Sequence, residues 1–107
     1  MRIARLADQI RDVIAINLTT ELRDPRLANV TITHVALSSD LQIASVYFRT
    51  LRAEHNSTAV ALRGAAGFFR SKLAAALDVK RVPELRFYYD VSIERIARIE
   101  SLLTKIR

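Results

Sequence analysis

The sequence has no cysteine and no tryptophan, and only two glycines and two prolines in 107 residues. Without cysteine it has no disulfide framework, no thiolate metal site and no thiol redox chemistry, and a reducing compartment is expected. It also lacks an apolar run long enough for a signal peptide or a membrane-spanning helix, because charged residues recur every few positions. These absences predict a soluble, cytoplasmic protein.

Hydrophobic residues make up 50% of the chain, so intrinsic disorder is not expected. A chain of this length is expected to form one domain, residues 1–107, that buries roughly two-thirds of its unfolded surface. No repeat, low-complexity segment or linker interrupts it. A monomer is the default expectation for such a domain.

Charge is distributed unevenly along the chain. The formal net charge is +6, from 17 basic and 11 acidic side chains, and 14 of the basic residues are arginine. Residues 49–86 carry eight of the basic but only three of the acidic side chains, so five of the six net charges lie there. Arginine presents a planar fork that matches phosphate oxygens and stacks on bases. The middle of the chain is therefore predicted to bind nucleic acid.

The hydrophobic pattern predicts an α+β fold with a three-stranded sheet packed by helices, in the order α-β-β-α-kink-α-β-α. The first helix carries an apolar stripe from Ile3 onward and is expected to end near Asp24, because Pro25 follows. Strands are expected over Asn29–Leu37, Gln42–Leu51 and Pro83–Tyr89. The other helices are expected from Ala59, over Phe68–Leu77, and after a cap at Asp90 or Ser92.

Polar residues mark the turns and helix starts. Ser38-Ser39-Asp40 is typical of a turn, so the first two strands are expected to form an antiparallel hairpin. Ser57 or Thr58 is expected to cap the helix that begins at Ala59. Alternation in the second strand places Ala44, Val46 and Phe48 on one face and Ser45, Tyr47 and Arg49 on the other. The apolar stripe of the last helix consists of Ile93, Ile96, Ala97, Leu103 and Ile106.

The two glycines frame a tetrapeptide, Gly64-Ala65-Ala66-Gly67, between two helices. Two helices joined by GxxG beside a three-stranded sheet are the layout of a KH domain, in which small residues let nucleic-acid backbone approach and a helix N-terminus faces phosphate. Close packing of the helix on the sheet explains Ala65 and Ala66 equally well. The predicted RNA-binding residues are Arg63, Gly64, Ala65, Ala66, Gly67, Arg70, Lys72, Lys80, Arg81 and Arg86.

No arrangement of side chains indicates catalysis, a metal site or a cofactor. Asp24, Asp40 and Asp90 each lie at a turn or helix boundary, where aspartate commonly caps or forms an Asx-turn. His34 is expected to be a packed or edge residue of a strand, and His55 to lie in a solvated loop. Tyr89 is expected to pack in the sheet, whereas Tyr47 and Tyr88 could either pack or stack on bases.

Several motifs, in order along the chain, resemble one family. Asp24-Pro25-Arg26-Leu27 matches a DPRL turn, Leu37-Ser38-Ser39-Asp40-Leu41 a segment between strands, and Gly67-Phe68-Phe69-Arg70 a GF-x-R motif. The longest is Val82 to Asp90, which matches PEL-x-F-x-YD and is continued by Ser92 and Glu94. Over essentially its whole length the chain resembles ribosome-binding factor A, a family of bacterial small-subunit assembly factors.

The resemblance implies a type II KH-like fold, in which Ala-x-Gly usually replaces GxxG, so the kink is expected at Ala65-Ala66-Gly67. Gly64 departs from this pattern by restoring a literal GxxG, and Ile96 stands where members commonly have glycine. The resemblance further implies binding to free 30S subunits near the neck, against 16S ribosomal RNA. The implied role is late maturation of that RNA, often important in the cold, followed by release with help from a GTPase.

Two functions of different kinds fit the sequence. The first is an assembly factor that acts by binding RNA, mostly through arginine–phosphate contacts, and holds one conformation of an immature rRNA. The second is a protein-binding module whose basic surface serves only solubility. An enzyme is a distant third, since no catalytic group supports it.

Overall fold

The computed structural model describes residues 2–106. Its elements are α1 (Arg2–Thr20), η1 (Pro25–Leu27), β1 (Thr31–Leu37), β2 (Ile43–Arg49), η2 (Arg52–Glu54), α2 (His55–Gly64), α3 (Ala66–Ala76), β3 (Glu84–Tyr89) and α4 (Ser92–Ile106). The predicted order of helices and strands is confirmed. The side chain of Arg52, in the predicted basic segment, lies outside the described part of the structure. So do those of Ile93, Ala97 and Ile106, which belong to the predicted apolar stripe of the last helix.

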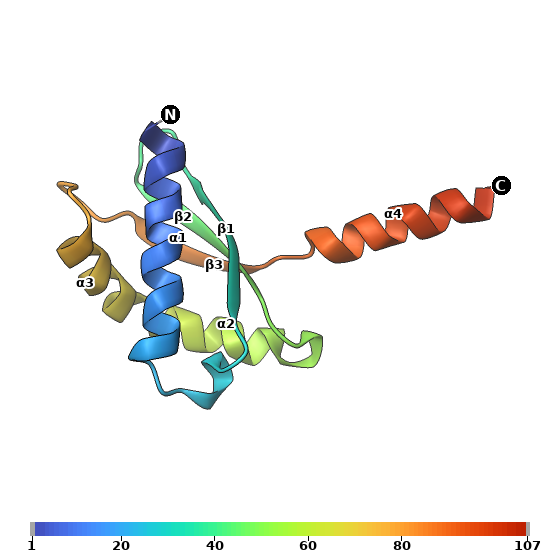
Figure 1. The fold of residues 1–107 in the computed structure, drawn as a ribbon, viewed down its shortest axis with the longest axis horizontal. Coiled ribbons are helices and arrows are strands. Elements are labelled where there is room, and N and C mark those ends of the chain that lie inside the picture. The colour runs from blue at the N-terminus through green and yellow to red at the C-terminus, as the bar shows by residue number, and fades with distance from the viewer. Residues whose placement is uncertain (1, 107) are drawn as a thin grey trace.

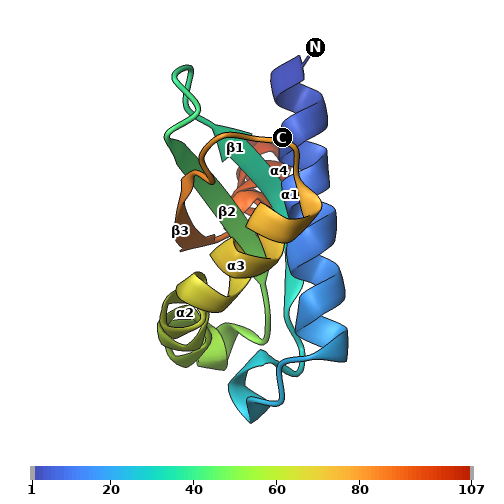
Figure 2. The same ribbon diagram turned by 90° about the vertical axis from the view of Figure 1, so that its left-hand side faces the viewer.

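The sheet has the order β1-β2-β3, with β1 and β2 antiparallel and β2 and β3 parallel. The first pair is the predicted hairpin, closed by a turn in which the Ser38 amide donates to the Ile43 carbonyl at 2.9 Å. Parallel strands need a crossover, and α2 and α3 supply it. Helix α1 packs on β1 and α3, while α2 and α3 pack on β3 (Figure 1). Figure 2 shows α3 in front of the sheet and α4 behind it.

The core lies between the sheet and the helices α1, α2 and α3. Its largest buried side chains include Phe48 of β2, Phe69 of α3 and Phe87 of β3, and the rings of Phe69 and Phe87 are 6.0 Å apart. Ala44 and Val46 are fully buried on the same face of β2 as Phe48. The intervening β2 residues stay partly exposed, so the predicted alternation is confirmed.

The predicted start of the second helix is wrong by one turn. The helix begins at His55, after η2, and not at Ala59. Neither expected cap acts as one: the Ser57 hydroxyl donates to the Glu54 carbonyl at 2.9 Å, and the Thr58 side chain is fully buried within the helix. Serine and threonine can bond to preceding carbonyls inside a helix, so their presence did not fix its first residue.

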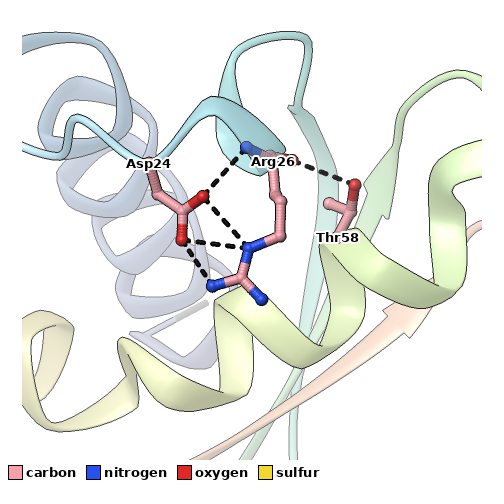
Figure 3. A network of polar contacts seen from close by, with 3 residues as sticks. All are labelled: Asp24, Arg26 and Thr58. Atoms are coloured by element: carbon pink, nitrogen blue, oxygen red, sulfur yellow. Dashed lines mark hydrogen bonds and ion pairs between the residues drawn. The ribbon is translucent and has the colours of Figure 1, made fainter.

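The segment Asp24–Leu27 forms a compact corner that holds α2 against the chain after α1 (Figure 3). The Asp24 carboxylate accepts from the Arg26 amide at 2.9 Å and pairs with its guanidinium at 2.6 Å. Pro25 occupies the first turn of η1, where its missing N–H costs nothing, and Leu27 is buried. The Thr58 hydroxyl donates to the Arg26 carbonyl at 3.0 Å. The side chain of Thr58 is therefore a tertiary link between η1 and α2.

Helix α4 extends away from the sheet (Figure 1). Two members of its predicted apolar stripe are described, and both are exposed: Ile96 at 56% and Leu103 at 59%. None of the described helices is both long enough and apolar enough to cross a membrane.

Candidate nucleic-acid interface

The break between α2 and α3 is one residue wide. Ala65 has φ −93° and ψ 3°, and its amide makes the last bond of α2, to the Ala61 carbonyl at 3.1 Å. On the other side of the break, the Phe69 amide donates to the Ala65 carbonyl at 3.0 Å. The amides of residues 66–68, at the start of α3, have no acceptor within that helix. Free N–H groups and the positive end of the helix dipole make such a helix start favourable for an anion.

The glycines and the alanines of the break lie in different surroundings. Ala65 and Ala66 are partly buried and pack against the core, which supports the packing explanation for them. Gly64 and Gly67 are exposed, a Cβ at either position would meet nothing within 4 Å, and neither has a positive φ. Nothing inside the fold therefore requires glycine here, although glycine in a helix costs roughly 0.5–1 kcal/mol relative to alanine.

Three basic side chains lie near the break. Arg63 is exposed and its Nη2 donates to the Phe87 carbonyl at the free edge of β3, 3.3 Å away. Arg70 is exposed on α3, and no carboxylate in the described part of the chain pairs with it. Lys72 is already engaged, because its Nζ lies 2.8 Å from the Glu21 carboxylate and 5.4 Å from the centre of the Phe68 ring. Arg63 and Arg70 are therefore more available to phosphate than Lys72.

The other predicted residues lie elsewhere. Lys80 and Arg81 are in the loop between α3 and β3, where they line a hollow with residues 40–42 of the hairpin turn. Helix α3, whose 11 residues span about 16 Å, separates that loop from the break. Arg86 is on the sheet face opposite α3, and its Nε lies 2.7 Å from the Glu84 carboxylate. The ten predicted residues thus occupy three separate places on the surface.

Three aromatic side chains outside the predicted site form a row on the open face of the sheet. Tyr47 is the register partner of both His34 and Tyr88, and its ring centre is 5.9 and 5.6 Å from theirs. Tyr89 points the other way and packs as predicted, stacked on His55 at 4.6 Å. The alternation within each strand indicated which side chains share the open face. The sequence did not show that β3 pairs with β2, which brings Tyr88 beside Tyr47.

The family model for ribosome-binding factor A matches residues 2–103. The chain belongs to this family. Among the members, the ribosome-binding factor A proteins of Chromohalobacter salexigens and Heliobacterium modesticaldum are 40% and 43% identical, over 95% and 98% of this chain and 81% and 88% of theirs. The family name describes ribosome binding, in agreement with a binding factor and not an enzyme.

Solved structures of the family share the fold. The crystal structure of ribosome-binding factor A from Thermus thermophilus superimposes with a TM-score of 0.76 at 32% identity, covering 81% of this chain and 93% of that one. The Thermotoga maritima protein, a putative ribosome-binding factor A, gives 0.75 at 39%, covering 87% and 91%. A Thermus thermophilus homology model fitted into a cryo-EM map of a 30S–RbfA complex gives 0.69 at 31%, covering 83% and 96%. The KH-like α+β fold expected from the resemblance is confirmed.

The three aspartates that could suggest catalysis in this family member have structural roles. The Asp24 carboxylate caps η1, and that of Asp40 accepts from the Ser38 hydroxyl and the Gln42 amide at 2.8 and 3.2 Å. Hydrogen bonds to these ionised carboxylates, chiefly from Arg26 and Ser38, lower the pKa of both. The described residues bring no three metal-ligating side chains together.

Asp90 fastens the end of the sheet to α4. Its carboxylate accepts from the Ser92 amide at 2.9 Å and from the Thr33 hydroxyl at 2.5 Å, so it joins β1 to the start of the helix. Its own carbonyl accepts from the Arg49 guanidinium at 2.5 Å. Hydrogen bonds from Ser92 and Thr33, assisted by the positive charge of Arg49, lower the Asp90 pKa to about 2.

Substituting Asp90 with asparagine is expected to lower the free energy of unfolding at neutral pH by about 1 kcal/mol, because the amide accepts weaker hydrogen bonds than the carboxylate. The folded-state pKa lies below the unfolded value, so this stabilisation is complete above about pH 4 and disappears as the pH falls toward 2. Urea denaturation of both proteins across this pH range measures the effect. A constant difference between them down to pH 2 would contradict the assignment.

Proposed function

We propose that this protein is a ribosome assembly factor that binds free 30S subunits and 16S rRNA near the neck and promotes late rRNA maturation. It acts in the cytoplasm as a monomer, as a single KH-like RNA-binding domain over residues 1–107. The observation that carries the proposal is the likeness to the Thermus thermophilus factor placed in a 30S complex, 96% of whose chain is covered. The first amides of α3, which have no acceptor within that helix, and the arginines beside them supply a surface suited to RNA.

Binding alone is sufficient for this function. The amides of residues 66–68 and the Arg63 and Arg70 guanidinium groups would contact phosphate oxygens, with the exposed Gly64 and Gly67 allowing close approach. Lys72, Lys80, Arg81 and Arg86 would extend these contacts, while Ala65 and Ala66 hold the break against the core. Such contacts read RNA shape more than sequence. A factor that binds one conformation of immature rRNA more tightly shifts the RNA toward it without a catalytic group.

Co-sedimentation with purified small subunits, before and after nuclease treatment, tests the proposal. We expect association with intact subunits that weakens steeply as salt increases and is lost after the exposed rRNA is digested. A complex that survives digestion and responds weakly to salt would instead identify a protein-binding module. Absence of co-sedimentation at low salt would exclude both.

A further inference from the structure

The open face of the sheet carries one aromatic side chain from each strand. His34 of β1, Tyr47 of β2 and Tyr88 of β3 follow one another across the sheet as register partners. Their ring planes are inclined by 30° and 34° between neighbours whose ring centres are 5.9 and 5.6 Å apart, so each ring partly faces the next along the row. Since α1, α2 and α3 pack on the opposite face, none of these three helices covers the row (Figure 2).

The row is accessible, although each ring touches its neighbour. Tyr88 is 41% exposed, His34 is exposed, and Tyr47 between them is half-buried. Cross-strand aromatic pairs also stabilise sheets, and that role alone needs no ligand. A groove on the same face, beside the row, indicates that a ligand binds here.

A groove of about 570 Å³ runs beside the row, between the sheet and the start of α4. Tyr47 and Tyr88 line one side, and Arg95 and Ile96 of α4 the other. The Arg95 side chain is exposed and has no carboxylate partner in the described part of the chain. The Asp90 carboxylate, at the end of the groove, is bound to Thr33 and Ser92. The groove therefore presents aromatic faces next to an available cation.

We propose that this open face is a second RNA contact, where His34, Tyr47 and Tyr88 stack on unpaired bases and Arg95 binds a phosphate. Aromatic faces beside positive charge are the arrangement by which proteins hold single strands. An acidic protein would satisfy Arg95 but would make no particular use of a row of three aromatic side chains. The proposal rests on the proposed function, since rRNA would supply the bases.

The two RNA contacts would be continuous around the edge of the sheet. Strand β3 is an edge strand, and Arg63, at the helix break, reaches the carbonyl of Phe87 on that edge. The next residue, Tyr88, projects onto the open face. A single strand that passes over β3 could therefore place phosphates at the break and bases on the row.

The test compares two single-stranded probes of about ten nucleotides, oligoadenylate and an abasic ribose-phosphate oligomer of the same length. The full chain should bind oligoadenylate about tenfold more tightly than the abasic oligomer. In Tyr47→Thr/Tyr88→Thr, which places β-branched residues suited to strands at both positions, this preference should disappear while the salt dependence stays unchanged. Ile16→Thr, at a similarly exposed position on α1, is the matched control and should behave as the parent. With no tryptophan in the chain, quenching of tyrosine emission reports the stacking directly.

Tyr88→Phe keeps the ring and should retain the preference, and single Tyr88→Thr, at an exposed edge position, serves if the double variant does not fold. Equal binding of the two probes by the parent, or an unchanged preference in a folded Tyr88→Thr variant, would overturn the second RNA contact. Salt-dependent subunit binding in the same proteins would still uphold the proposed function. A Tyr47→Thr/Tyr88→Thr variant that lost subunit binding but kept its affinity for oligoadenylate would also overturn the second RNA contact, in favour of protein docking on this face. A parent that bound neither RNA nor subunits would refute both proposals.

Discussion

Substituting Arg63, Arg70 and Arg81 together with alanine is expected to weaken binding to free small subunits by about 100-fold at moderate salt. Each phosphate contact contributes about 0.7 to 0.9 to the slope of log affinity against log salt, so losing three should reduce that slope by about 2 to 3. Co-sedimentation or equilibrium binding over a series of salt concentrations measures both quantities. Stability should change little, because the one bond lost with a described partner is the 3.3 Å contact from Arg63 to the Phe87 carbonyl.

The control for this variant carries the same change in net charge at other places. Alanine at Arg11, Arg23 and Arg98 removes three charges from α1, the segment after it, and α4, and should reduce affinity only slightly. Because Arg81 is separated from the break by α3, its effect should add to that of the other pair. A triple variant that co-sediments normally, or a control that weakens binding equally, would show that the basic segment is not the interface.

Substituting Gly67 with aspartate is expected to have opposite effects on stability and binding. Residue 67 lies in the first turn of α3, where a carboxylate interacts favourably with free amides and the helix dipole. A Cβ there meets nothing within 4 Å, so the free protein should gain about 0.5–1 kcal/mol. If phosphate occupies the same place in the complex, the carboxylate would repel it and reduce subunit affinity by about 100-fold. Urea denaturation and subunit binding measure the two effects.

Two further variants make this prediction specific. Gln9→Asp adds the same charge to an exposed position of α1 and should leave subunit binding nearly unchanged. Gly67→Ala adds only a methyl group, so it should also stabilise the free protein but weaken binding less than aspartate does. Unaltered affinity in a more stable Gly67→Asp protein would mean that the start of α3 does not face RNA.

Strand positions could be read closely from the sequence, because burial imposes a two-residue period on a strand with one covered face. Ala44, Val46 and Phe48 are completely buried, as their alternation indicated. The first residue of α2 could not be read as well. Ser57 and Thr58 resemble helix caps, yet Thr58 is buried and bonds to Arg26, a residue 32 positions earlier. A hydroxyl that satisfies a distant carbonyl cannot be distinguished from a cap by local sequence.

In the candidate site, too, the features set by local sequence were predictable and those set by tertiary packing were not. The break at Ala65 was predictable, since two glycines three residues apart interrupt a helical pattern. The exposure of Gly64 and Gly67 was not predictable, because it depends on which side of each helix faces the core. Charge counting also gave one basic segment, whereas the fold distributes it over the break, the loop before β3 and the open face of the sheet.

The sequence by itself determined the element order, the core faces, the helix break and, through its motifs, the family. These follow from local periodicity and from residues adjacent in the chain. Only the tertiary structure decided which charges remain available and which aromatic side chains meet. Lys72 is paired with Glu21 from α1, and Tyr47 meets Tyr88 because the crossover aligns β3 beside β2. Contacts between residues so far apart depend on how the helices and strands pack, which no local pattern specifies.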